Sequence, residues 1–136
     1  MIEESYVLKS DRDEIKRVEE ILKRINQNLC FPEDKFINLL IAVSEALVNA
    51  IVHGNHLDKL KKVFLNITYN DNFITVQVQD EGSGFDTSQI PDPTLDENLL
   101  RENGRGLFII KSLVDKCTVN TTKNGTEVTL TIYKTL

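Results

Sequence analysis

The apolar positions in the first half of the chain follow a helical spacing. From Asp11 to Leu29 they recur three or four residues apart, which predicts an amphipathic helix with one buried face. A second helix is expected from Phe31 to about His53, because Pro32 suits a first helical turn and the Gly54-Asn55 pair suits a helix end. The sequence therefore predicts two long helices in succession.

Other segments alternate between apolar and polar residues, as half-buried strands do. Turn-prone residues at 70–72 and 124–125 join four of these segments into two hairpins. The expected strands are Glu4 to Lys9, Val63 to Tyr69, Phe73 to Gln79, Lys116 to Thr122 and Thr126 to Lys134, and a short third helix is expected from Gly106 to Val114. This order predicts one α+β domain over residues 1–136, a two-layer sandwich in which three helices cover one face of a mostly antiparallel sheet.

Composition narrows the classes of partner. The 136 residues carry a net charge of −5, which argues against general nucleic-acid binding because such proteins usually have a basic surface. A phosphate ligand would therefore need local positive potential from a metal ion, an arginine or a helix N-terminus. Cys30 and Cys117 lie in apolar surroundings without metal-binding spacing, so we expect two buried, reduced thiols.

Neither the N-terminal residues nor the most apolar run indicates a membrane protein. The first residues are acidic and lack the apolar core of a signal peptide. The run from Phe36 to Val52 contains Glu45 and Asn49, and we expect it to fall short of a membrane span. The expected location is the cytoplasm.

The second predicted helix carries polar residues where a buried helix should have none. It is apolar almost all round between Leu39 and Val52, yet Glu45, Asn49 and His53 follow one another at four-residue intervals on one stripe. A buried carboxylate is costly unless it is paired, so the stripe indicates a cavity for a charged ligand or ion. The alternative is that Glu45 reaches a helix edge, Asn49 bonds a loop backbone and His53 only ends the helix.

Two glycine-containing loops add further candidate chemistry. The loop Asp80-Glu81-Gly82-Ser83-Gly84 follows a strand directly, and its glycines permit close approach of a flat ligand while Asp80 can accept a hydrogen bond from an exocyclic amine. The segment Gly104-Arg105-Gly106 leads into a helix, whose N-terminus and Arg105 suit phosphate. The polar residues 86–103 between the loops are long enough for a lid. Each loop taken alone is also ordinary turn material.

Taken together and in order, these motifs resemble the GHKL ATPase superfamily, whose nucleotide site is known as the Bergerat fold. The matching features are Glu45-x-x-x-Asn49-x-x-x-His53-Gly54, Asp80-x-Gly82-x-Gly84, Gly104-x-Gly106 and Gly125-Thr126. Chain length and the run from Ser44 to Ala50 are most similar to the anti-sigma factor serine/threonine kinases, the group that includes RsbW and SpoIIAB.

The resemblance implies a role for each matching residue. Asn49 would hold Mg²⁺ at the phosphates of ATP, and Glu45 would orient or deprotonate the attacking hydroxyl as the catalytic residue. Asp80 would bind the adenine amine. The remaining ATP-binding positions implied are Gly82, Gly84, Gly104, Arg105, Gly106 and Thr126.

The resemblance also implies a function. The chain would phosphorylate a serine or threonine of a STAS-type antagonist protein and would regulate transcription by binding a sigma factor, and the resemblance favours a homodimer. Two alternatives remain open at this point: an ATP-gated binding module without transfer activity, and a detached catalytic domain that phosphorylates a histidine. Phosphoryl transfer depends mainly on positioning and electrostatics, so a metal ion, a carboxylate and a closing lid suffice for it.

Overall fold

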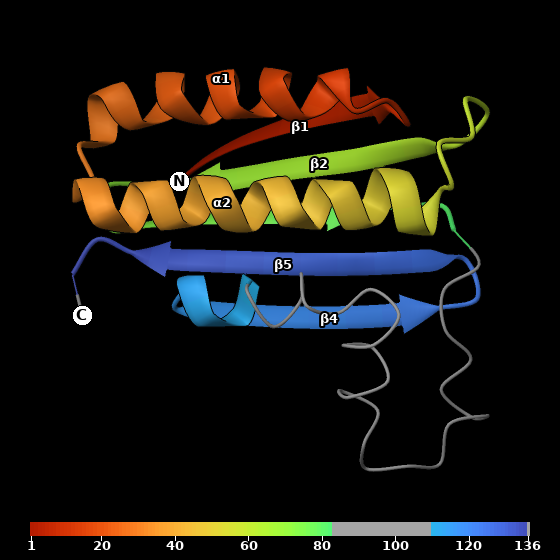
Figure 1. Cartoon of the computed structure of the whole chain (residues 1–136). Helices are drawn as coiled ribbons and strands as arrows, with labels where there is room; N and C mark the ends of the chain where they lie inside the picture. The colour runs from red at the N-terminus through yellow and green to blue at the C-terminus, as the bar shows by residue number, and fades with distance from the viewer. Residues whose placement is uncertain (83–109, 136) are drawn as a thin grey trace, which may run out of the picture.

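The computed structural model describes residues 1–82 and 110–135. The described elements are β1 (Ile2–Lys9), α1 (Asp13–Leu29), α2 (Glu33–Val48), the π-helical turn η1 (Asn49–Gly54), β2 (Lys62–Tyr69), β3 (Phe73–Gln79), β4 (Lys116–Thr122) and β5 (Gly125–Tyr133). Residues 110–113 are also helical. Figure 1 shows α1 and α2 side by side over one face of the sheet. The predicted two-layer α+β sandwich is confirmed.

The five strands form one antiparallel sheet in the order β1-β2-β3-β5-β4. Alternate residues of the three central strands point to the helices and are buried, among them Leu65, Val76 and Leu130. Their neighbours on the opposite face are mostly threonine, asparagine and glutamine. The alternation that predicted the strands therefore separates a helix-covered face from an uncovered one.

The second helix continues beyond the end of regular α-helix. Asn49 still donates its backbone N–H to Ala46 and Glu45, but Asn55 donates to Ala50 five residues back, which widens the last turn into a π-helix. The combined helix Glu33–Gly54 has the length and composition of a membrane span, contrary to expectation. Its apolar composition is explained by its place as the central core helix, because its inner face packs on β3 and β5.

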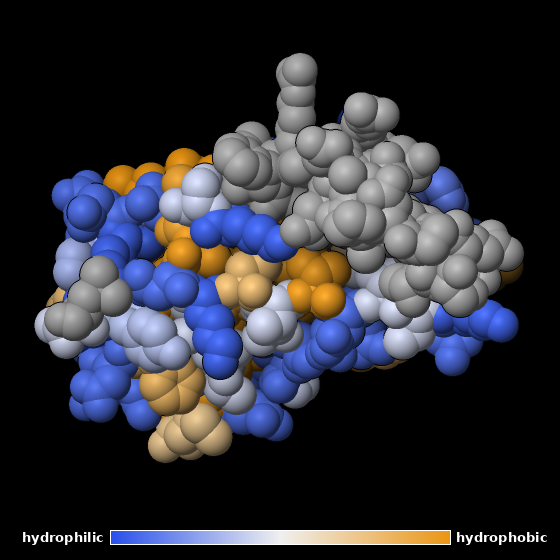
Figure 2. All heavy atoms as spheres, turned by 90° about the horizontal axis from the view of Figure 1, so that it is seen from below, coloured by the Kyte–Doolittle hydropathy of each residue, from blue (hydrophilic) through white to orange (hydrophobic). Residues whose placement is uncertain are grey.

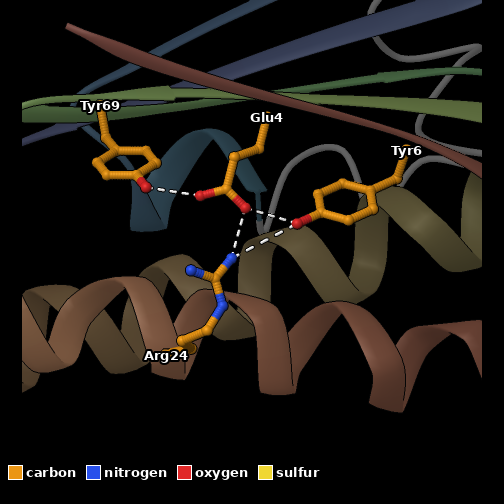
Figure 3. A network of polar contacts seen from close by, with 4 residues as sticks. All are labelled: Glu4, Tyr6, Arg24 and Tyr69. Atoms are coloured by element: carbon orange, nitrogen blue, oxygen red, sulfur yellow. Dashed lines mark hydrogen bonds and ion pairs between the residues drawn. The ribbon is translucent and has the colours of Figure 1, made fainter.

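A polar cluster fastens α1 to the first two strands (Figure 3). The Glu4 carboxylate on β1 accepts hydrogen bonds from Tyr6 at 2.5 Å and from Tyr69 of β2 at 2.6 Å, and it forms an ion pair with Arg24 of α1. Partial burial disfavours the charge on Glu4, but the bonds from the two tyrosines and Arg24 outweigh it and lower its pKa. The charged form of Glu4 is therefore the one that holds the two layers together here.

The cysteine prediction was wrong for one residue. Cys30 is exposed because it ends α1 in the left-handed conformation, with φ of 54°. Cys117 on the edge strand β4 is half-buried, and this burial raises the pKa of its thiol. Both are free thiols, as expected.

Candidate functional site

The described part of the candidate site lies at one end of the sheet, where β3 ends, β5 begins and η1 meets them. Asp80 and Gly82 follow β3, Thr126 is the second residue of β5, and Asn49 opens η1. Glu45 lies one turn earlier on α2. The structure thus brings together residues from distant parts of the sequence. The other predicted site residues, Gly84, Gly104, Arg105 and Gly106, lie outside the described residues, as do the first four residues of the third predicted helix.

The Asp80 carboxylate is held in a fixed orientation. Its Oδ1 accepts backbone N–H bonds from Gly82 at 2.9 Å and from Thr126 at 3.1 Å, and the backbone N–H of Asp80 donates to Thr126 O at 3.0 Å. No described residue donates to Oδ2, so this oxygen can accept from a ligand. Asp80 is 4% exposed, and burial raises its pKa, although these two hydrogen bonds and nearby Lys61 act in the opposite direction.

Three glycines surround Asp80 so closely that no side chain fits. A Cβ on Gly54 would lie 2.3 Å from Asp80 Oδ2, and a Cβ on Gly82 would lie 2.3 Å from the carbonyl oxygen of Gly54. Gly125 adopts φ of +141°, and its Cβ would lie 2.1 Å from the carbonyl oxygen of Asp80. The glycines therefore let the backbone of these three residues pack directly against Asp80 and against one another, which fixes the position of its carboxylate.

Asn49 has the property expected of a ligand-binding side chain. Its Nδ2 is buried, and no hydrogen-bond partner for it occurs among the described residues. An unpaired buried amide costs free energy, so such a group calls for an acceptor that the folded chain does not supply. The expectation that it bonds a loop backbone is not met. An amide carbonyl is a suitable Mg²⁺ ligand and an amide N–H suits a phosphate oxygen, so the residue fits Mg-ATP with either side-chain orientation.

Glu45 is half-buried on α2 and makes no hydrogen bond or ion pair with any described residue. The preceding residue, Ser44, points instead to α1 and donates to Glu19 at 2.9 Å. His53 is exposed in the last turn of η1, in keeping with a histidine that only ends the helix. The stripe predicted from the sequence therefore contains two candidate ligand-binding residues, Glu45 and Asn49.

The sequence alone did not identify Asn55, which organises the end of the sheet. It is fully buried, and its Nδ2 donates to Ser10 Oγ and to the carbonyl oxygen of Lys62, each at 3.0 Å. Its Oδ1 accepts from the backbone N–H of Glu81 at 2.8 Å. Asn55 thus connects β1, β2 and the loop that carries Asp80. The only sequence signal is an asparagine directly after a helix-ending glycine, and the Gly54-Asn55 pair predicts no more than the end of a helix.

The class of protein follows from comparison with known families. A sequence profile of the histidine kinase-like ATPase domain matches residues 8–132. The chain belongs to this family.

Particular relatives narrow the class further. The chain is 32% identical over 120 residues to the serine-protein kinase RsbW of Bacillus subtilis (strain 168), covering 82% of this chain and 73% of the relative. It is 38% identical over 101 residues to RsbW of Staphylococcus aureus (strain MRSA252), covering 68% of this chain. The chain spans 62% of the length of that Staphylococcus aureus relative.

Solved structures support the fold. The crystal structure of the RsbU and RsbW domains of a Mycobacterium tuberculosis protein superposes with a TM-score of 0.70 at 18% identity, over 97% of this chain and 32% of the other. A chain in the crystal structure of the SiaB–SiaC complex from Pseudomonas aeruginosa superposes with a TM-score of 0.67 at 12% identity, over 95% of this chain and 88% of the other. At these identities the likeness is one of architecture.

Proposed function

We propose that the protein is an ATP-dependent serine/threonine kinase of the anti-sigma factor type. It would phosphorylate a STAS-type antagonist and bind a sigma factor, as a single cytoplasmic domain over residues 1–136 and, following the family resemblance, as a homodimer. The observation that carries the proposal is the buried amide of Asn49, one helical turn after the carboxylate of Glu45, neither of which has a side-chain partner among the described residues. The RsbW relatives, named serine-protein kinases, support this proposal over the two alternatives.

The described residues divide the work between binding and catalysis. Asp80 Oδ2 would accept from the adenine amine, while the close packing of Gly54, Gly82 and Gly125 and the two bonds to Oδ1 hold the carboxylate in place. Asn49 would hold Mg²⁺, which neutralises the phosphate charge that an acidic chain cannot, and ATP supplies the phosphoryl group. Gly84, Gly104, Arg105 and Gly106 complete the proposed phosphate and adenine contacts.

Glu45 would act on the acceptor protein. Its carboxylate is free of partners among the described residues, so it can accept a hydrogen bond from the serine or threonine hydroxyl and take its proton as the oxygen–phosphorus bond forms. A pure ATP-binding module has no use for such a group. Glu45 is thus the residue that distinguishes transfer from binding alone.

Nucleotide binding is tested by thermal unfolding with and without Mg-ATP. Ligand at about 100 times its Kd should add about 2.7 kcal/mol to the free energy of unfolding. The variant Asn49→Ala should lose most of the Mg²⁺-dependent part, whereas Asn38→Ala, a matched change on the same helix, should keep it. The absence of any shift at millimolar Mg-ATP would rule out the proposed site.

Transfer is tested with labelled ATP and STAS-domain proteins from the same genome. The kinase proposal expects acid-stable label on the acceptor and a rate at least about 100-fold lower for Glu45→Gln, as is usual when a general base is lost. Acid-labile label would instead indicate a histidine acceptor. Nucleotide-dependent binding without label would indicate a regulatory module.

A further inference from the structure

The outer face of α2 is apolar and uncovered by the described elements. Ile37 and Ile41 are each 45% exposed, and Val48 and Val52 continue the same side as half-buried residues. Figure 1 looks directly onto this face, and neither α1 nor the helical residues 110–113 crosses it. In Figure 2 hydrophobic atoms gather along the upper-left margin, on the side of the helix layer. These four residues form what we call the α2 ridge.

The ridge adjoins the proposed catalytic residue. Glu45 is four residues after Ile41 and three before Val48, so its side chain lies on the turn between them, beside the ridge. A protein that covers the ridge brings its own surface groups next to Glu45. Since the proposed reaction needs a hydroxyl at this carboxylate, the ridge is placed where an acceptor protein has to bind.

The charges around the ridge restrict its partner. Glu33 and Asp34 are exposed at the start of α2 and make no ion pair with any described residue, and Glu45 is also unpaired. An acidic partner surface would be repelled at both ends of the ridge, whereas a neutral or basic rim would be attracted. The four apolar residues of the ridge and the acidic residues beside them fit an interface with an apolar centre and a charged rim.

We propose that the α2 ridge is the docking surface for the acceptor protein, with Ile37 and Ile41 as its anchors. The acceptor would present one or two apolar side chains to these isoleucines, a neutral or basic rim to Glu33 and Asp34, and its hydroxyl to Glu45. This inference rests on the proposed kinase function and names the surface that function uses.

The test combines Ile37→Ser and Ile41→Ser in one variant. Its control is Val7→Ser, which removes an apolar side chain that is 61% exposed on the uncovered face of the sheet. Acceptor binding is measured by calorimetry in a non-hydrolysable ATP analogue with Mg²⁺, and transfer by steady-state kinetics. The double variant should weaken acceptor binding and raise KM for the acceptor by about tenfold or more, as loss of central apolar anchors does. The turnover at saturating acceptor and the Kd for Mg-ATP should match wild type.

Several results would overturn the docking surface. The proposal is wrong if the double variant binds the acceptor with wild-type affinity and has a wild-type KM for it. It is also wrong if Val7→Ser loses as much acceptor affinity as the double variant. If the double variant has a changed Kd for Mg-ATP, the ridge is covered by another part of the same chain. If the double variant has a changed sedimentation coefficient, the ridge is covered by a second copy of the protein. If wild type transfers no phosphate, the kinase function fails, and the calorimetry still decides whether a bound acceptor uses the ridge. If no acceptor binds at all, both proposals are wrong.

Discussion

Replacing Asp80 by asparagine should separate adenine recognition from folding. The Oδ1 atom accepts both backbone N–H bonds, from Gly82 and Thr126, and the amide oxygen of an asparagine can accept them equally. The amide NH₂ then takes the place of Oδ2, the oxygen to which no described residue donates a hydrogen bond. A hydrogen-bond donor would therefore face the adenine amine, which is also a donor.

The expected loss follows from the kind of hydrogen bond removed. A hydrogen bond to a charged group contributes about 1.5–3 kcal/mol, which corresponds to about 10- to 150-fold in Kd for Mg-ATP. Facing donors add a desolvation cost, so the upper part of this range is the better expectation. The free protein should not suffer, because Asp80 →Asn removes a buried charge.

The sign of the stability change can be worked out from the pKa of Asp80. Burial raises this pKa in the folded state, so the folded protein favours the protonated carboxyl more than the unfolded chain does. The associated stability is present below the unfolded pKa and is lost as pH rises through the folded pKa. At neutral pH the ionised carboxylate therefore costs stability, and Asp80→Asn should unfold at the same temperature as wild type or higher.

The assay is calorimetric titration with Mg-ATP and Mg-ITP, with thermal unfolding of the free proteins alongside. ITP carries a carbonyl oxygen where ATP carries the amine, so Asp80→Asn should lose the preference for ATP or reverse it. Asp71→Asn, a matched change in the exposed β2–β3 turn, should leave both affinities unchanged. Equal weakening of ATP and ITP, or a large fall in unfolding temperature, would refute recognition of the amine by Asp80.

Three further changes test other parts of the structure. Asn55→Ala removes three side-chain hydrogen bonds from a fully buried amide and should lower the free energy of unfolding by about 3 kcal/mol in urea titrations, and a loss under 1 kcal/mol would contradict its organising role. Gly125→Ala combines a positive φ with a clash against Asp80 and should cost about 2 kcal/mol or more, whereas Asn124→Ala in the same turn should cost little. Glu4→Gln should cost about 1–2 kcal/mol at pH 7. Because hydrogen bonding lowers the pKa of Glu4, its contribution is present above the unfolded pKa and is lost as pH falls through the folded one, so the unfolding temperatures of variant and wild type should converge as the pH falls below the ordinary pKa of a glutamate.

Local patterns were enough to predict most of the fold. The bounds of β3 and β4 agree with the sequence prediction to the residue, and the second helix extends to Gly54 as expected. Strand alternation and helical spacing are short-range patterns, so they can be recognised in the sequence without knowledge of the tertiary structure. The exposure of Cys30 was not predictable in this way, because it depends on the left-handed turn that ends α1.

The candidate site was predictable in its residue types and only partly in its geometry. The spacing of Glu45 and Asn49 on one helix, and the Asp80 loop after a strand, are visible in the sequence. Asn55 was missed because its partners Ser10 and Lys62 lie on two other elements, one of them 45 positions away along the chain. Contacts of this kind are set by the pairing of strands, which no local window contains.

The π-helical turn η1 has a consequence for how this chain tolerates insertions and deletions. A π-helical turn accommodates one residue more than an α-helical turn of the same length, so deleting one residue from η1 would convert it to regular α-helix. Gly54 and Asn55 would then keep their places beside Asp80, whereas a one-residue deletion in the regular part of α2 would rotate them by about 100°. The π-helical turn is therefore the place in this helix where the chain can lose one residue without changing how the helix end meets the loop after β3.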